Sequence, residues 1–88
     1  MHSDRFFTLS ASCPDQVGII ARVSGFIASN GGWILESSFH SDVLTSRYFM
    51  RIEIKANSLP FLRAEFRERF RTDVAEPLAM TWQINDSA

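Results

Sequence analysis

Hydrophobic and polar positions along the chain follow two different periods. Residues 5–12, "RFFTLSAS", alternate with a period of two, which is typical of a strand with one buried face. The segment 16–30 instead spaces its apolar residues as a helix does, at Ile19, Ile20, Val23, Phe26 and Ile27. The pattern therefore predicts a strand followed by a helix.

Turn residues mark both ends of this helix. The letters "CPD" interrupt the strand pattern, and Asp15 is a residue type that caps helix N-termini. The run Asn30, Gly31 and Gly32 follows the last apolar position and supplies a left-handed residue that ends a helix. We therefore expect the helix to run from Gln16 to Asn30.

The second half of the chain repeats the alternation and then the helical spacing. Two alternating runs flank the polar turn "SDVLTS", which predicts a hairpin. A further helix is expected after the caps Asn57 and Ser58, with an apolar stripe of Leu59, Leu62, Phe66 and Phe70. The expected elements are strands at about 5–12, 33–41, 46–56 and 78–85 and helices at about 16–30 and 59–74.

This order constrains the topology. Two right-handed strand-helix-strand units joined by a hairpin form a four-stranded antiparallel sheet with both helices on one face. The predicted fold class is an α+β, ferredoxin-like βαββαβ sandwich, with residues 1–88 as a single domain. By alternation, the face without helices would carry Phe6, Trp33, Leu35, Phe39 and Phe49. Monomers rarely expose so much apolar surface, so a partner is expected to cover it.

Composition and charge narrow the class of protein. Nine basic and ten acidic residues give the 88-residue chain a net charge of −1, so no overall field attracts nucleic acid or an anionic membrane. No apolar run approaches the roughly 20 residues of a membrane span, and a single cysteine fits a reducing compartment. The run "SRYFMRIEI" lacks the glycine of an RNA-binding motif. We expect a cytoplasmic protein that binds neither nucleic acid nor membranes.

Residues that could carry metal or nucleophilic chemistry are scattered. His2, Cys13 and His40 do not have the paired spacing of a metal site, so no metal and no cofactor is expected. Pro14 directly follows Cys13, and no base with an orienting group accompanies the thiol. Cys13 is therefore interpreted as a small buried or half-buried thiol, and the chain is expected to contain no catalytic residue and no catalytic domain.

The turn before the first helix is the strongest candidate for binding. A helix N-terminus carries unpaired amides and a partial positive charge, which suit a carboxylate. Gly18 costs about 1 kcal/mol relative to alanine inside a helix. It could admit a ligand to those amides, or it could let the turn pack against the next strand. Both interpretations remain open at this point.

The same stretch, "LSASCPDQVGIIARVSGFIASNGGWILESS", resembles the start of an ACT domain, whose hallmark is Pro-Asp-x-x-Gly at a strand-to-helix turn. With "VSGF", "ILESS", "RYFMR" and "MTW" in order, the likeness from Phe6 to Asp86 narrows to the N-terminal ACT domain of the formyltetrahydrofolate deformylase family. The resemblance implies a regulatory domain fused to a formyltransferase-like catalytic domain. Enzymes of this family hydrolyse 10-formyltetrahydrofolate to formate and tetrahydrofolate in one-carbon and purine metabolism.

The resemblance also implies a ligand site between two copies of the domain. A small amino acid, glycine or methionine, would lie between two groups of residues, Asp15, Gln16, Val17, Gly18 and Ile19 of one copy and Gly31, Gly32, Trp33 and Ile34 of the other. Many ACT domains carry asparagine where this chain has Trp33. An indole offers one donor and no acceptor, so Trp33 is equally suited to a packed interface. Three functions remain open: a dimeric amino-acid sensor, a purely structural dimerisation domain and a free-standing ACT regulator.

Overall fold

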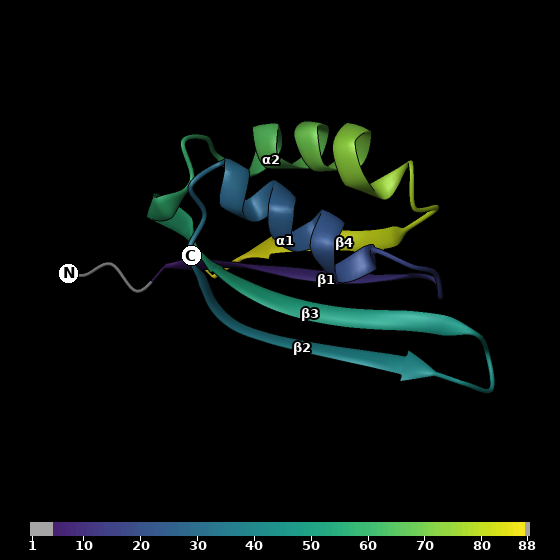
Figure 1. The fold of residues 1–88 in the computed structure, drawn as a ribbon. Coiled ribbons are helices and arrows are strands. Elements are labelled where there is room, and N and C mark those ends of the chain that lie inside the picture. The colour runs from purple at the N-terminus through teal and green to yellow at the C-terminus, as the bar shows by residue number, and fades with distance from the viewer. Residues whose placement is uncertain (1–4, 88) are drawn as a thin grey trace.

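The computed structural model describes residues 5–87, which form one antiparallel sheet with two helices on one of its faces (Figure 1). The strands lie in the order β2-β3-β1-β4. The elements are β1 (Phe6–Pro14), α1 (Ile19–Ser29), β2 (Ile34–Asp42), β3 (Arg47–Lys55), α2 (Arg63–Phe70) and β4 (Thr81–Asp86), with a 3₁₀ turn η1 (Ala56–Ser58) and a π-helical turn η2 (Arg71–Ala75). The predicted βαββαβ sandwich is confirmed.

The core lies between the sheet and the helices. Alternate residues of β1, from Phe7 to Cys13, are buried against it. Phe66 of α2 occupies the centre and is fully buried. Four phenylalanine rings, those of Phe7, Phe26, Phe61 and Phe70, have centroids within 6.4 Å of the Phe66 centroid. The aromatic side chains thus join α1, α2 and β1 into one packed unit.

Helix α1 ends as its glycines predict but begins differently. Gly31 has a φ of 77°, and Gly31 and Gly32 donate hydrogen bonds to the carbonyls of Ala28 and Ile27. At the other end the helix begins at Ile19, because Gly18 is its N-cap with a φ of 88°. The expectation that Asp15 caps this helix was wrong.

Helix α2 also begins later than the apolar spacing predicts. The ring of Pro60 disfavours a helical conformation at the residue before it, and Leu59 is extended at φ −89° and ψ 146°. The helix starts only at Arg63, so Ser58 does not cap it. Leu62, which was predicted to belong to the apolar stripe, is instead 71% exposed.

The face of the sheet without helices is mainly polar. Phe6 and Phe49 lie on this face as alternation predicts, but Phe39 does not. An irregularity in the β2–β3 pairing between Ile34 and Glu36 shifts the register by one residue. As a result Phe39 pairs with Met50 and packs against the core on the helix side. Polar side chains cross the middle of the open face at Ser38, Arg51, Ser10 and Gln83. The area of exposed apolar surface therefore no longer argues for a cover on this face.

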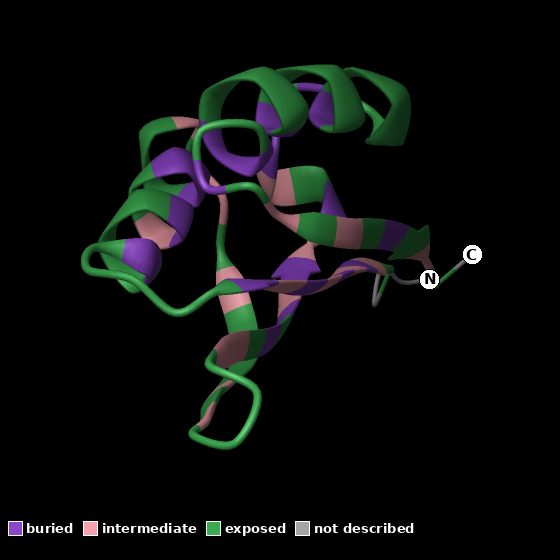
Figure 2. Ribbon diagram, turned by 90° about the vertical axis from the view of Figure 1, so that its right-hand side faces the viewer, coloured by how far each residue is buried: buried purple, intermediate pink, exposed green. Residues whose placement is uncertain are grey.

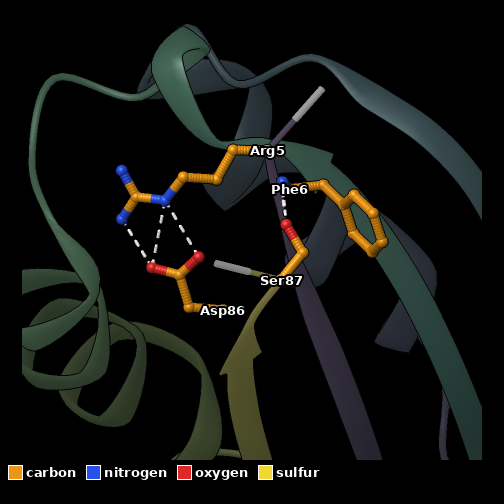
Figure 3. Close-up of polar contacts among 4 residues, drawn as sticks. All are labelled: Arg5, Phe6, Asp86 and Ser87. Atoms are coloured by element: carbon orange, nitrogen blue, oxygen red, sulfur yellow. Dashed lines mark hydrogen bonds and ion pairs between the residues drawn. The ribbon is translucent and has the colours of Figure 1, made fainter. Parts of the chain in front are cut away.

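The two edges of the sheet differ in how they are held. At the end of β4, the Arg5 guanidinium binds the Asp86 carboxylate through Nε and Nη2, and the Phe6 amide donates to Ser87 Oγ at 2.9 Å (Figure 3). Strand β2 forms the opposite edge and is hydrogen-bonded only to β3. The β2–β3 hairpin projects away from the helices with an exposed tip (Figure 2).

Candidate functional site

The turn between β1 and α1 presents the unpaired amides of a helix N-terminus. Arg22 N donates to Gly18 O at 3.0 Å, so the amides of Ile19, Ile20 and Ala21 precede this first helical hydrogen bond. No side chain caps them. A hollow of about 200 Å³ lies beside them, lined by Gln16, Gly18, Ile19, Ile20, Ala21 and Tyr48. The turn therefore combines a partial positive charge with space for a small anionic group.

Gly18 is required by its own backbone and not by a close neighbour. A Cβ atom built on Gly18 would meet no heavy atom within 4 Å. Its φ of 88°, however, lies in the left-handed region that L side chains adopt only at a cost of about 1–2 kcal/mol. Neither crowding by β2 nor any other contact explains this glycine. The left-handed backbone of the turn explains this glycine. Because Gly18 has no side chain, the hollow stays open on the side that Gly18 lines.

Polar contacts fix this turn to the β2–β3 hairpin. The Asp15 carboxylate accepts a hydrogen bond from Ser41 Oγ at 2.6 Å, and the Asp15 amide donates to Ser46 O at 3.0 Å. The Gln16 amide group donates to the carbonyls of Pro14 and Leu78. These contacts occupy the polar atoms that could otherwise have capped α1. Val17, in contrast, is 99% exposed.

The second group of predicted site residues lies at the opposite end of α1 (Figure 1). Trp33 is 61% exposed, its amide donates to Ser58 Oγ, and Lys55 Nζ lies 4.9 Å from its ring centroid. Ile34 is partly buried against the core. The eleven residues of α1 place the two groups about 16 Å apart at 1.5 Å per residue. One chain alone does not bring them together.

Sequence reasoning missed a second hollow, which lies on the open face of the sheet. Its volume is about 420 Å³, and its lining includes Ser10, Ser12, Ser38 and Thr81. It forms where short hydroxyl side chains flank the larger Phe49 and Arg51 of β3. Ser12 lies opposite Phe49, and Ser10 and Ser38 lie opposite Arg51. The run "SAS" in the first strand indicates two small polar side chains on one face. Only the order of the strands shows that they lie beside Ser38 and Thr81 and so form a hollow.

The residues considered for metal chemistry stay apart. Within residues 5–87, no three His, Cys, Asp or Glu side chains are grouped so that they could hold a metal ion. His40 lies on the open face beside Phe49, with ring centroids 6.4 Å apart, and His2 falls outside the described residues. None of the helices in the described part of the chain is long and apolar enough to cross a membrane.

Cys13, predicted to be buried or half-buried, is fully buried, and burial raises the pKa of its thiol. We expect a thiol reagent at neutral pH to leave the folded protein unmodified and to react fully in denaturant, because only the exposed thiolate is nucleophilic. As the pH rises, the thiol ionises in the unfolded protein before it ionises in the folded protein. The contribution of Cys13 to the free energy of unfolding is therefore complete below the pKa of the unfolded thiol and is lost as the pH rises through the pKa of the folded thiol. Prompt modification of the folded protein would contradict this. A Thr45→Cys variant, with its thiol in the exposed turn of the hairpin, is the positive control.

The sequence of the chain is similar to part of the sequence of known enzymes. No family model matches the chain. It is 36% identical over 80 residues to a formyltetrahydrofolate deformylase from Synechocystis sp., covering 91% of this chain and 28% of that protein. A formyltetrahydrofolate deformylase from Bacillus subtilis is 36% identical over 77 residues, covering 86% and 25%. The chain thus spans about a quarter of the length of these relatives.

Solved structures agree with these relatives. A formyltetrahydrofolate deformylase from Pseudomonas syringae pv. tomato has a TM-score of 0.92 at 55% identity, covering 96% of this chain and 28% of that one. An ACT domain protein from Streptococcus pneumoniae shares the fold, with a TM-score of 0.78 at 24% identity, covering 96% of this chain and 91% of that one. The chain therefore has the fold of an ACT domain. Nearly its whole sequence is similar to one segment of formyltetrahydrofolate deformylases, and that segment makes up about a quarter of their length.

Proposed function

We propose that this chain is a regulatory domain that pairs with a second copy and binds a small amino acid, glycine or methionine. Bound ligand would control a formyltransferase-like catalytic domain that hydrolyses formyltetrahydrofolate. The similarity to formyltetrahydrofolate deformylases supports this role, because the matched part makes up only 28% of the Synechocystis relative and 28% of the Pseudomonas syringae one. The remainder of such a protein leaves room for a separate catalytic domain.

The observation that carries this proposal is the uncapped first turn of α1 beside the 200 Å³ hollow. A ligand carboxylate would accept hydrogen bonds from the amides of Ile19, Ile20 and Ala21, where the helix dipole favours negative charge. A hollow of this volume is small compared with typical ligand pockets of about 300–1,000 Å³, which favours a ligand of amino-acid size. The exposed side chain of Ile20 offers an apolar contact for methionine.

Trp33 supports the alternative, a dimerisation domain that binds nothing small. Its indole is 61% exposed and is held by Lys55 at the surface. Tryptophan is enriched at the energetic centres of protein interfaces, where it buries a large area. In this alternative the second copy covers Trp33, and the amides of α1 remain hydrated.

Calorimetric titration with glycine and with L-methionine separates the two functions. We expect saturable heat from one of them, and an at least tenfold loss of affinity in an Ala21→Leu variant, whose larger side chain fills the hollow. Ala64→Leu makes the same change at an exposed position of α2 outside the hollow and is the matched control. If neither amino acid gives heat with the dimeric protein, or if both variants bind equally well, the sensing function is wrong.

A further inference from the structure

Asn30 and Gly31, at the end of α1, form a pair in which the asparagine can lose its amide group without an enzyme. The Gly31 nitrogen gives up its proton and bonds to the side-chain carbonyl carbon of Asn30, and the side-chain nitrogen leaves as ammonia. Water then opens the cyclic imide to aspartate or isoaspartate, so an amide is exchanged for a carboxylate. Glycine favours the attack, because it has no side chain to shield its nitrogen.

The folded end of α1 holds the two reacting groups apart. The Gly31 amide donates a hydrogen bond to Ala28 O at 2.9 Å, and Asn30 Nδ2 donates one to Phe26 O at 2.8 Å. The ψ of Asn30 is 10°, so the Gly31 nitrogen nearly eclipses the backbone nitrogen of Asn30 and points away from the side chain. Ring closure requires rotation about this bond and loss of the Gly31 hydrogen bond. It can therefore occur only when the last turn of α1 opens.

We propose that Asn30 is a site of spontaneous deamidation, that opening of the last turn of α1 sets its rate, and that the carboxylate formed keeps this turn weakened. Helix ends open locally at a much lower free-energy cost than global unfolding, so the folded protein reaches the reactive conformation. Asn30 is already partly exposed, and water is the only co-reactant. This inference does not depend on the proposed function.

The carboxylate weakens the turn for two physical reasons. It accepts hydrogen bonds but donates none, so the contact from residue 30 to Phe26 O is lost and the oxygens repel each other. The C-terminus of a helix carries a partial negative charge, and the last turn of α1 contains no basic residue to offset a new one. Deamidation of Asn30 therefore loosens the segment that leads through Gly32 to Trp33.

Peptide mapping by mass spectrometry, after incubation at mildly alkaline pH, tests the site. Asn57 is exposed and precedes serine, so it serves as the comparison within the same chain. In guanidinium chloride we expect Asn30 to deamidate faster than Asn57. In the folded protein the rate at Asn30 should fall by about tenfold or more, because only the opened fraction reacts. Equal rates at Asn30 in the two conditions, or no reaction at Asn30 in denaturant, overturn the proposal.

Two glycine variants test whether opening of this turn sets the rate. A Cβ at Gly32 would lie 2.6 Å from Ile27 Cγ2, so Gly32→Ala should loosen the end of α1 and speed deamidation of Asn30 in the folded protein severalfold. A Cβ at Gly25 meets nothing within 4 Å, so Gly25→Ala should not speed it. The same rate in both variants would mean that another motion controls the reaction.

An Asn30→Asp variant tests the consequence of the reaction. Its melting temperature should lie about 3 °C or more below that of the wild type, because a hydrogen bond is replaced by repulsion at the helix end. Asn57→Asp makes the same change at an exposed position and should leave the melting temperature almost unchanged. Wild-type melting of Asn30→Asp would overturn the weakening of the turn.

Discussion

Replacing Phe66 by alanine should remove a large share of the free energy of unfolding of the domain. The Phe66 side chain is fully buried, and its ring lies in contact with rings from β1, from α1 and from α2 itself. Truncation removes these contacts and leaves a cavity between the helices and the sheet. Since Phe7, Phe26 and Phe70 also pack on other neighbours, they cannot all move to fill it.

The free energy lost in this variant is large compared with the total stability of the domain. Phenylalanine-to-alanine changes in cores cost about 3–5 kcal/mol, whereas an 88-residue domain has a total stability of about 4–13 kcal/mol at 0.05–0.15 kcal/mol per residue. Urea unfolding followed by circular dichroism measures the difference. Phe49→Ala, at a ring 40% exposed on the open face, is the control and should cost less than about 1 kcal/mol. Equal losses in the two variants would mean that the core is not centred on Phe66.

The period of the hydrophobic pattern was sufficient to predict the fold. The alternation of Phe7, Leu9 and Ala11 and the helical spacing around Val23 each reflect one face packed against a single core. The order of the elements then left few topologies, because crossover connections have one hand. The open face was harder to predict. One extra residue near Leu35 reverses the alternation along β2, and no local pattern distinguishes a bulged strand from a regular one.

The helix starts were mispredicted because tertiary contacts decided them. Asp15 has the right side chain for a cap, but Ser41 on the adjacent hairpin takes its carboxylate. Ser58 likewise binds the Trp33 amide and the Lys55 carbonyl, which belong to other segments. In contrast, the left-handed glycine after α1 depends only on local backbone geometry and was predicted correctly. Local signals were reliable where no distant partner competed for the same atoms.

The candidate site could be predicted from the sequence only in part, because one part of it depends on contacts between distant segments. Unpaired amides at Ile19 and Ile20 follow from any helix start near Gly18, so the turn could be predicted. Whether Trp33 belongs to the same site depends on a second copy, since α1 separates the two ends within one chain. The two groups form one site only if a second copy supplies one of them.

Gly32→Ala should destabilise the domain by about 1–3 kcal/mol, the usual cost of overpacking. A Cβ at this position would lie 2.6 Å from Ile27 Cγ2 and 3.0 Å from both Ile27 O and Leu59 Cδ2. Ile27 is fully buried and its carbonyl is backbone, so neither can move freely. In a domain of this size the melting temperature should fall by about 4–8 °C per kcal/mol, measurable by differential scanning calorimetry.

Gly25→Ala is the matched control, because it is also a glycine of this region but a Cβ there meets nothing within 4 Å. Inside α1 the exchange should raise stability by about 0.5–1 kcal/mol, through the higher helix propensity of alanine. Opposite signs at the two glycines would show that Gly32 is kept by packing, even though it lies among the predicted ligand-binding residues. A Gly32→Ala protein that melts normally but loses amino-acid binding would instead show that this glycine serves the ligand.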